Sequence, residues 1–307
     1  MSRAVIYEMF GGPEVLELRD VPEPHAGAGE VRVRVAAVGL NPMDWVLSSM
    51  PVMAQQFGIT LPSGFATDFA GTVDEVGEGV SGFAVGDRVY GAATGRAAAD
   101  FLVVDPAGAD RLFRTPAEIS DEVAGTLAVA GRTASAALAA IDVQTDDTVL
   151  IGGAAGGVGV FAVQLARLAG ARVIGTASAG TFDFLRQFGV TPVTYGPGLA
   201  DRVRAMAPNG VDAASDLYGT EAAEAALALG VPPGRISTIA AGPNPPGGVR
   251  PTGGVNAQPE DLKRITDAIV ADEITVPIAV TFPIEGIQEA VRLQAERHVH
   301  GKIVVTF

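Results

Sequence analysis

A glycine-rich segment in the middle of the chain, residues 148–167, constrains the fold more than any other stretch. Within it, the β-branched and apolar run at 149–151 is followed at once by glycines and then by apolar residues at helical spacing. This order predicts a strand, a tight turn and a helix start, because the change of hydrophobic period falls on the glycines. Such a turn aims backbone N–H groups and the positive end of a helix dipole at one point.

The turn also matches part of the dinucleotide-binding pattern G-x-G-x-x-G. Ala154, Gly156 and Gly159 stand at the glycine positions, so alanine replaces the first glycine. Because a strand precedes the turn and a helix follows it, we expect the amides of Gly156, Gly157 and Val158 to hold the pyrophosphate of a dinucleotide. The alternative is a glycine turn that only lets the helix pack closely on a sheet.

Composition argues against several classes of protein. The 307 residues include no cysteine, so neither disulfides nor thiolate metal sites can form. A net charge of −14 argues against nucleic acid and membrane surfaces as partners. The uncharged stretch at 148–166 approaches the length of a membrane span, but its central glycines argue against one. The N-terminal residues do not resemble a secretory signal, so we expect a cytoplasmic protein.

Local patterns indicate two domains of different architecture. In the first 120 residues, short alternating runs separated by Gly and Pro predict strands, which is typical of an antiparallel, barrel-like β domain. These runs lie at 4–7, 15–18, 31–38, 70–76, 88–90 and 101–104.

From about residue 121, helix-length apolar segments alternate with short strands, which predicts an α/β domain with a parallel, doubly wound sheet. The predicted helices are 121–141, 157–168, 182–188 and 220–229, and the predicted strands are 149–151, 172–176, 192–195, 213–216 and 235–240. The tail predicts helices at 260–270 and 285–294 and strands at 278–282 and 302–307. Two late strands are most simply explained if the tail returns to the first domain.

Ordered motifs along the whole chain resemble the zinc-independent quinone oxidoreductase branch of the medium-chain dehydrogenase/reductase superfamily. They lie at 11–16, 39–44, 68–73, 80–90, 132–134, 153–160 and 300–304. The resemblance implies a GroES-like β-barrel catalytic domain at 1–120 and 272–307, a Rossmann domain at 121–271 and a catalytic cleft between them. It also implies a homodimer that uses NADPH to reduce quinones or conjugated enones.

Two polar residues are candidates for the catalytic site. Pro42 pushes Asn41 towards an extended conformation, so its amide can project from a strand end. In the resembling family this asparagine reaches the nicotinamide ribose and the substrate carbonyl, whereas the alternative is a helix cap or turn. Thr133 matches a family threonine that faces the nicotinamide, although a buried threonine can instead bond its own helix. We expect structural roles for Asp44 and Asp68.

The choice of cofactor depends on the residues after the second strand of the sheet. An NAD site usually has Asp or Glu there, whereas residues 175–181 contain no acid, so NADPH is favoured over NADH. Ser178 and Thr181 can donate to a 2′-phosphate, and Tyr195 matches a family tyrosine that closes this pocket. No Arg or Lys stands beside Gly180, and Arg186 lies one turn into the next predicted helix.

Three further residues are predicted to bind the cofactor. Ala240 and Ala241 end a predicted strand, where small residues admit the nicotinamide and a backbone amide can bond its carboxamide. Lys302 belongs to a terminal Gly-Lys pair that, by the resemblance, approaches the cofactor. The alternative for Lys302 is a strand-edge lysine without such a role.

Catalytic zinc is not expected, and the substrate side is apolar. A zinc site needs about three protein ligands, and the chain offers only His25, His298 and His300, which we interpret as surface residues. An uncharged cluster after Asn41 suits a planar apolar guest or is plain core. Its members are Met43, Trp45, Met50, Met53 and Phe57.

The leading hypothesis is hydride transfer from NADPH to a small apolar quinone or conjugated carbonyl compound. Such an acceptor needs alignment over the nicotinamide and hydrogen-bond donors for the forming oxyanion, which Asn41 and Thr133 would supply. Water can protonate the product. Two alternatives stay open: a reductase for an enoyl thioester or biosynthetic intermediate, and a non-catalytic NADPH-binding redox sensor or structural protein.

Overall fold

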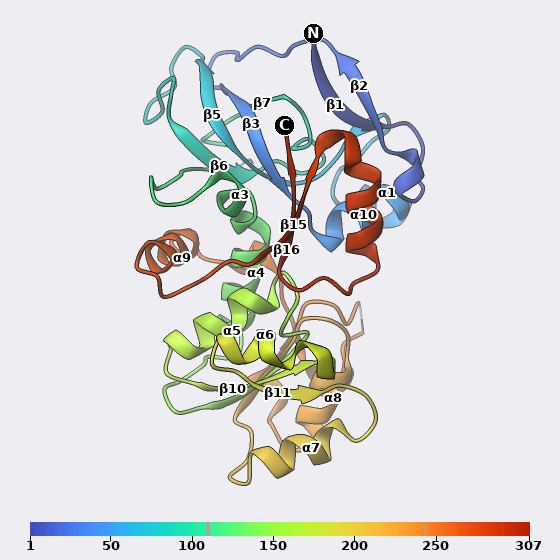
Figure 1. Ribbon diagram of the computed structural model, residues 1–307, viewed down its shortest axis with the longest axis vertical. Coiled ribbons are helices and arrows are strands. Elements are labelled where there is room, and N and C mark those ends of the chain that lie inside the picture. Colours follow the sequence, from blue (N-terminus) through green and yellow to red (C-terminus); the bar gives the residue numbers. More distant parts are fainter. Residues whose placement is uncertain (109–110, 243) are drawn as a thin grey trace. The chain divides into compact units, whose positions relative to one another are not determined.

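The computed structural model describes residues 1–108, 111–242 and 244–307, which form two compact units (Figure 1). Unit 1 comprises Met1–Val129 and Ile278–Phe307, and unit 2 comprises Ala130–Pro277. Both boundaries fall later than the expected positions after residues 120 and 271. The reason at the first boundary is that residues 121–129 bond to strands of unit 1: Gly39 N–H donates to Gly125 O, and Val129 N–H donates to Asp68 Oδ1.

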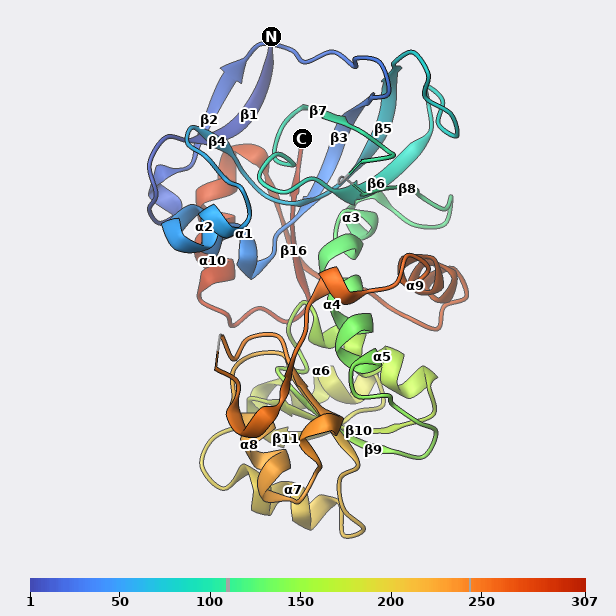
Figure 2. The ribbon, with the colours of Figure 1, turned by 180° about the vertical axis from the view of Figure 1, so that it is seen from behind.

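Unit 1 contains two sheets and four α-helices. The seven-stranded sheet has the order β15 (Ile278–Pro283), β16 (Lys302–Thr306), β3 (Val31–Gly39), β5 (Asp68–Val76), β6 (Arg88–Ala92) and β8 (Arg111–Arg114), with β7 (Phe101–Val104) also paired to β3. The three-stranded sheet has the order β2 (Glu17–Val21), β1 (Ser2–Tyr7) and β4 (Ser63–Gly64), visible in Figure 2. The helices are α1 (Pro42–Ser49), α2 (Pro51–Gln56), α3 (Asp121–Ala124) and α10 (Ile287–Ala295), with 3-10 turns η1 (Pro13–Val15) and η6 (Ile284–Gly286).

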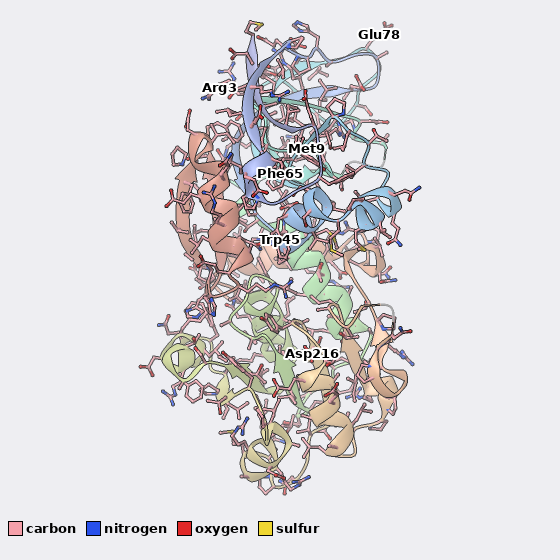
Figure 3. The ribbon with its side chains drawn as sticks, turned by 90° about the vertical axis from the view of Figure 1, so that its right-hand side faces the viewer. Arg3, Met9, Trp45, Phe65, Glu78 and Asp216 are labelled. Atoms are coloured by element: carbon pink, nitrogen blue, oxygen red, sulfur yellow. The ribbon has the colours of Figure 1, made fainter. Side chains whose placement is uncertain are left out.

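Alternating apolar residues explain why these strands pack as they do. In β3, Val31, Val33 and Val35 are buried, and they join a core that includes residues of β1, β5 and α10. Phe65, labelled in Figure 3, is among the largest fully buried side chains. The tail adds β16 antiparallel to β3, with Val304 opposite Gly39. The predicted return of the tail to the first domain is therefore confirmed.

Unit 2 is a six-stranded, all-parallel sheet with helices on both faces. Its order is β11 (Thr191–Thr194), β10 (Arg172–Ala177), β9 (Thr148–Gly152), β12 (Ala213–Asp216), β13 (Ile236–Thr238) and β14 (Arg250–Pro251). Figures 1 and 2 show α5 (Gly159–Leu168) and α6 (Phe182–Gln187) on one face, and α7 (Leu199–Met206) and α8 (Glu221–Ala228) on the other. The remaining elements are α4 (Leu127–Ala139), α9 (Asp261–Val270), η2 (Ala179–Thr181), η3 (Pro233–Arg235), η4 (Pro246–Gly248) and η5 (Gly254–Asn256). The doubly wound α/β prediction is confirmed.

The helix predictions need correction in two ways. The helix expected at 121–141 is divided into α3 and α4, with Gly125 and Thr126 between them. Helices α1, α2 and α7 were not predicted; in α7 only two of the eight residues, Leu199 and Val203, are buried. Across residues 1–108, 111–242 and 244–307, no helix combines the length and apolarity needed to cross a bilayer.

Candidate functional site

The glycine turn of unit 2 is wound tightly at the end of β9. Gly153 has a φ of +67° and donates its N–H to Thr176 Oγ1 at 3.0 Å. A Cβ on Gly159 would lie 2.3 Å from Gly153 O, so only glycine fits there. Helix α5 starts at Gly159, two residues later than predicted, because Gly157 and Val158 still belong to the turn.

The turn meets the requirements of a pyrophosphate site. Val160 N–H donates to Gly156 O and Ala162 N–H to Val158 O, both at 3.0 Å, and the helix dipole favours an anion at the N–H groups that precede them. A Cβ on Gly156 would have only Gly153 O within 4 Å, at 3.4 Å, so there is space in that direction, although the residue itself is half-buried. Of the three predicted contacts, the N–H of Gly156 already donates to Gly153 O at 3.1 Å, which does not agree with its expected role. The amides of Gly157 and Val158 stay predicted contacts.

The next two strand ends bring the predicted 2′-phosphate residues together. The Oγ atom of Ser178 and the Oγ1 atom of Thr181 lie 2.7 Å apart, just after β10. Strands β10 and β11 are paired, with Ala177 opposite Thr194, so Tyr195 follows on the neighbouring strand. Its side chain is 56% exposed. Arg186, in contrast, is paired with Asp183 on its own helix.

Sequence reasoning missed Arg202, which orders the loop carrying Tyr195. Its guanidinium on α7 donates to the carbonyl oxygens of Thr194 and Tyr195, and also to those of Gly196 and Pro197. The i, i+4 spacing of buried Leu199 and Val203 is the signal that could have revealed α7. Arg202 thereby supplies a cation beside the strand ends where no Arg or Lys was expected.

At the end of β13, the two predicted alanines stand in a turn and not in a strand. Strand β13 ends at Thr238, and Thr238 Oγ1 accepts the N–H groups of Ala240 and Ala241 at 3.4 and 3.2 Å. This hydroxyl-bonded turn shapes the loop at the carboxyl end of the sheet. Thr133 on α4 is buried, and a Cβ on Gly254 would lie 3.2 Å from its Oγ1.

Unit 1 holds a buried polar cluster built around Asn41. Lys302 Nζ donates to Asn41 Oδ1 at 2.7 Å and to Leu40 O at 3.0 Å. Asn41 Nδ2 donates to Asp68 Oδ2 at 3.0 Å and to Gly39 O at 3.3 Å. Lys302 is only 2% exposed and lies on β16, between β15 and β3.

The structure differs from the sequence-based interpretations of Asn41 and Lys302. The Asn41 amide does not project outward from a strand end, because Lys302 and Asp68 bind its oxygen and its nitrogen. Lys302 is not an edge lysine, because β16 is paired on both sides. Burial lowers the pKa of the Lys302 ammonium, although Asp68 and Asp44 oppose this shift.

Asp44 completes the cluster from the first turn of α1. Its carboxylate accepts Asn41 N–H at 2.7 Å and Thr67 Oγ1–H at 2.9 Å. Burial raises the pKa of the Asp44 carboxyl to about 7, because desolvation of the charged form outweighs these hydrogen bonds. Asp44 and Asp68 thus have the internal contacts expected of structural residues.

The apolar cluster after Asn41 is not a single surface. Trp45, labelled in Figure 3, packs against the core and donates its Nε1–H to Gln294 at 2.6 Å. Met50 and Phe57, in contrast, are exposed around α2. Trp45 therefore belongs to the structural part of unit 1.

The histidines do not come together as metal ligands in the described part of the chain. His25 Nδ1 lies 2.8 Å from Glu75 Oε1. Within residues 1–108, 111–242 and 244–307, no three His, Cys, Asp or Glu side chains are grouped to hold a metal.

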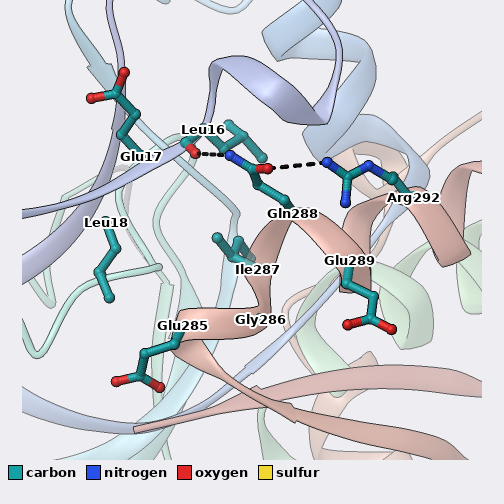
Figure 4. A pocket seen from close by; sticks show the side chains of 9 residues that line it. All are labelled: Leu16, Glu17, Leu18, Glu285, Gly286, Ile287, Gln288, Glu289 and Arg292. Carbon is teal, nitrogen blue, oxygen red and sulfur yellow. Dashed lines mark hydrogen bonds between the residues drawn. The ribbon is translucent and has the colours of Figure 1, made fainter.

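A surface cavity of about 500 Å³ in unit 1 contains none of the predicted site residues (Figure 4). Gln288 on α10 donates to Leu16 O within it, and Arg292 donates to Gln288. Of the carboxylates lining it, Glu17 pairs with Arg19 and Glu285 with Arg3.

Comparisons with known proteins agree with this architecture. The family model for the alcohol dehydrogenase GroES-like domain matches residues 27–138, and that for zinc-binding dehydrogenases matches 157–266. A quinone oxidoreductase of Pseudomonas aeruginosa is 38% identical over 180 residues, covering 58% of this chain and 54% of the relative. A mycobacterial protein solved in complex with NADPH aligns with a TM-score of 0.87 and 28% identity, over 100% of both chains. The CurK enoyl reductase aligns with a TM-score of 0.87 and 27% identity, over 99% of both chains.

These matches extend across both units. The chain spans about half the length of the Pseudomonas relative, 54% of it. The two family models cover strands of the seven-stranded sheet and most of the parallel sheet, and they confirm the GroES-like and Rossmann fold class. The chain belongs to the medium-chain dehydrogenase/reductase superfamily, in its quinone oxidoreductase branch.

Proposed function

We propose that this chain is an NADPH-dependent, zinc-independent reductase that transfers hydride to a quinone or a conjugated enone. The observation that carries the proposal is the glycine turn at the end of β9, where there is space beside Gly156 and Gly159 admits no side chain. A turn of this shape at a helix start suits a dinucleotide pyrophosphate. The quinone oxidoreductase relative supports the acceptor class.

Preference for NADPH over NADH rests on the strand end after β10. Ser178 is exposed and offers a hydroxyl group there, whereas Thr181 is 2% exposed and its Oγ1 lies 2.7 Å from Ser178 Oγ. Residues 175–181 contain no carboxylate that would repel a 2′-phosphate. Arg202 adds positive charge to the loop after β11. The mycobacterial neighbour complexed with NADPH supports the same choice.

When bound, NADPH supplies the hydride, and the reduced acceptor also takes one proton, which water can provide. The residues of the chain orient the partners and donate hydrogen bonds to the oxygen on which charge develops. Both Nδ2 hydrogens of Asn41 are already donated and the side chain is 4% exposed, so a ligand oxygen would have to displace Gly39 O, the longer of the two bonds at 3.3 Å. Thr133 Oγ1 is the second proposed donor. Lys302 holds the opposite end of the Asn41 amide.

Oxidation of NADPH in the presence of an acceptor panel tests the proposal. The panel contains quinones, enones and enoyl-CoA esters, and is measured with and without a metal chelator. We expect turnover of quinones or enones that the chelator does not change. Tight NADPH binding without turnover on any acceptor would favour the non-catalytic alternative. Absence of binding to either coenzyme at millimolar concentration would refute the proposal.

One alternative substrate class has its own support, because the CurK enoyl reductase shares the full fold. The alternative is reduction of an enoyl thioester or a biosynthetic intermediate. The same panel distinguishes the two. A kcat/KM for enoyl-CoA esters about tenfold above that for quinones, or about 1.4 kcal/mol, would identify the thioester reductase.

We also propose a homodimer and a cytoplasmic location, as the family resemblance and the cysteine-free composition suggest. Sedimentation velocity of the purified protein tests the first, and fractionation of the source cells tests the second. A monomer at micromolar concentration would contradict the dimer.

A further inference from the structure

The adjacent ends of β9 and β12 define one place in unit 2 where the chain leaves the sheet in opposite directions. Strand β9 continues through α5 to β10, and β12 continues through α8 to β13, on the other side of β9. In open parallel sheets, ligands bind in the crevice where the connections diverge. The loop after β12, residues 217–220, is therefore the second wall of that crevice, opposite the glycine turn.

The backbone of this loop is held by one buried carboxylate. Asp216, at the end of β12 and labelled in Figure 3, is 2% exposed. Its Oδ1 accepts the N–H groups of Tyr218 and Gly219 at 3.1 and 2.9 Å. Its Oδ2 accepts those of Ala222 and Ala223, at the start of α8, at 2.8 and 3.2 Å. The loop between β12 and α8 is thus held at both ends by one side chain, and the N–H of Tyr218 itself supplies one of the four hydrogen bonds.

The loop is also tied to the glycine turn itself. Leu217 N–H donates to Gly152 O at 3.1 Å. A Cβ on Gly153 would lie 3.0 Å from Cβ of Tyr218, so the tyrosine stands directly beside the turn. Its side chain is nevertheless 57% exposed. An aromatic ring with a fixed backbone and an exposed face offers a stacking surface at low entropic cost.

The direction of the bound dinucleotide follows from the strand order. Ser178, Thr181 and Tyr195 follow β10 and β11, on one side of β9, and are suited to the adenosine half. With the pyrophosphate at the start of α5, the other half extends across β12 and β13. Tyr218 is on the first loop that this half meets.

We propose that Tyr218 is a cofactor-contacting residue that packs against the nicotinamide mononucleotide half of NADPH, and that Asp216 is its positioning residue. This inference rests on the proposed function. It assigns the two exposed tyrosines of the strand ends to opposite halves of one ligand: Tyr195 to the adenosine 2′-phosphate half and Tyr218 to the nicotinamide half.

Calorimetry with two ligands tests this assignment. NADPH contains both halves, whereas adenosine 2′,5′-bisphosphate contains only the adenosine half. In Tyr218→Ala we expect the Kd for NADPH to rise about tenfold, the value of one aromatic contact. The Kd for the bisphosphate should stay within about twofold of wild type. Tyr218→Phe should bind both ligands as wild type does, because the ring is retained.

Tyr195→Ala is the matched control, since its side chain is 56% exposed and lies on the other side of β9. It should weaken binding of both ligands. Equal weakening of both ligands by Tyr218→Ala, or no weakening of NADPH, would overturn the assignment of Tyr218 while leaving NADPH binding intact. Failure of the wild-type protein to bind either ligand would overturn the proposed function and this inference together. Unchanged thermal unfolding of Tyr218→Ala would show that the loop is intact.

Discussion

The Nζ atom of Lys302 lies 2.7 Å from Oδ1 of Asn41, although 261 positions separate the two residues in the chain. This contact determines which end of the Asn41 amide faces Asp68, because an ammonium group can bind only the oxygen. It also joins β16, from the tail, to the start of α1. The buried charge of Lys302 is balanced by two buried carboxylates, Asp68 and Asp44.

Lys302→Met should strongly destabilise the protein. The change keeps the apolar stem but leaves Asn41 Oδ1 and Leu40 O without their donor, and removes the counter-charge of Asp68. Leaving buried acceptors and a buried carboxylate uncompensated in this way typically costs about 3–5 kcal/mol. Urea unfolding measures the loss. Lys263→Met is the control, because Lys263 is exposed and pairs only with Asp267; its cost should be below about 1 kcal/mol. Equal costs would contradict the role of Lys302.

The protonation of Asp44 should make stability depend on pH. The pKa of its carboxyl is raised from 3.8 to about 7 by burial. Between these values the folded state binds the proton and the unfolded state does not. The stabilisation that the protonated Asp44 contributes to the folded state is therefore fully present below about pH 4. It is lost as the pH rises through about 7.

Asp44→Asn tests this dependence, because the amide retains an oxygen for Asn41 N–H and gains a donor for Thr67. The variant should become more stable relative to wild type as the pH rises from 5 to 8, by about 2.6 kcal/mol, because the slope of about 1.4 kcal/mol per pH unit acts only up to the folded pKa of about 7. Unfolding free energies at several pH values measure the difference. A difference between the two proteins that is constant with pH would contradict a raised pKa.

Two glycine substitutions in the turn should have different effects. Gly159→Ala places a Cβ 2.3 Å from Gly153 O, so it should cost folding stability as well as cofactor binding. Gly156→Ala meets only Gly153 O, at 3.4 Å, so the fold should tolerate it. In the second variant NADPH affinity should still fall by about tenfold or more, because the backbone can no longer approach the pyrophosphate closely. Thermal unfolding and calorimetry together measure both effects; unchanged affinity in Gly156→Ala would place the pyrophosphate elsewhere.

Ser178→Asp should shift the cofactor preference towards NADH. Ser178 is exposed at the end of β10, and a carboxylate there would repel a 2′-phosphate and accept ribose hydroxyls. We expect the ratio of kcat/KM for NADPH to that for NADH to fall by about tenfold or more, a change of about 1.4 kcal/mol. Ser178→Asn has similar size without the charge and should change the ratio little. The hypothesis fails if the two variants change the ratio equally.

The elements predicted best are those in which the hydrophobic periodicity of a strand or a helix is complete within the element's own residues. Strand β9 and helix α5 lie within a residue or two of their expected bounds, because the change from strand to helix periodicity is local. Helix α7 escaped prediction because its apolar face contains only Leu199 and Val203. Arg202 lies on this helix and was therefore missed as well. Its side chain orders the loop by binding carbonyl groups, which no sequence motif indicates.

By itself, the sequence determined the two kinds of domain, the glycine turn and the absence of an acid after β10, because hydrophobic period and residue type are properties of neighbouring positions. It did not determine the direction of the Asn41 amide, the burial of Lys302 or the position of Tyr218 beside Gly153. Those depend on partners that are distant in the chain and come together only through strand pairing. The energy of a buried charge or a fixed amide is set by those partners, so only the tertiary structure decided them.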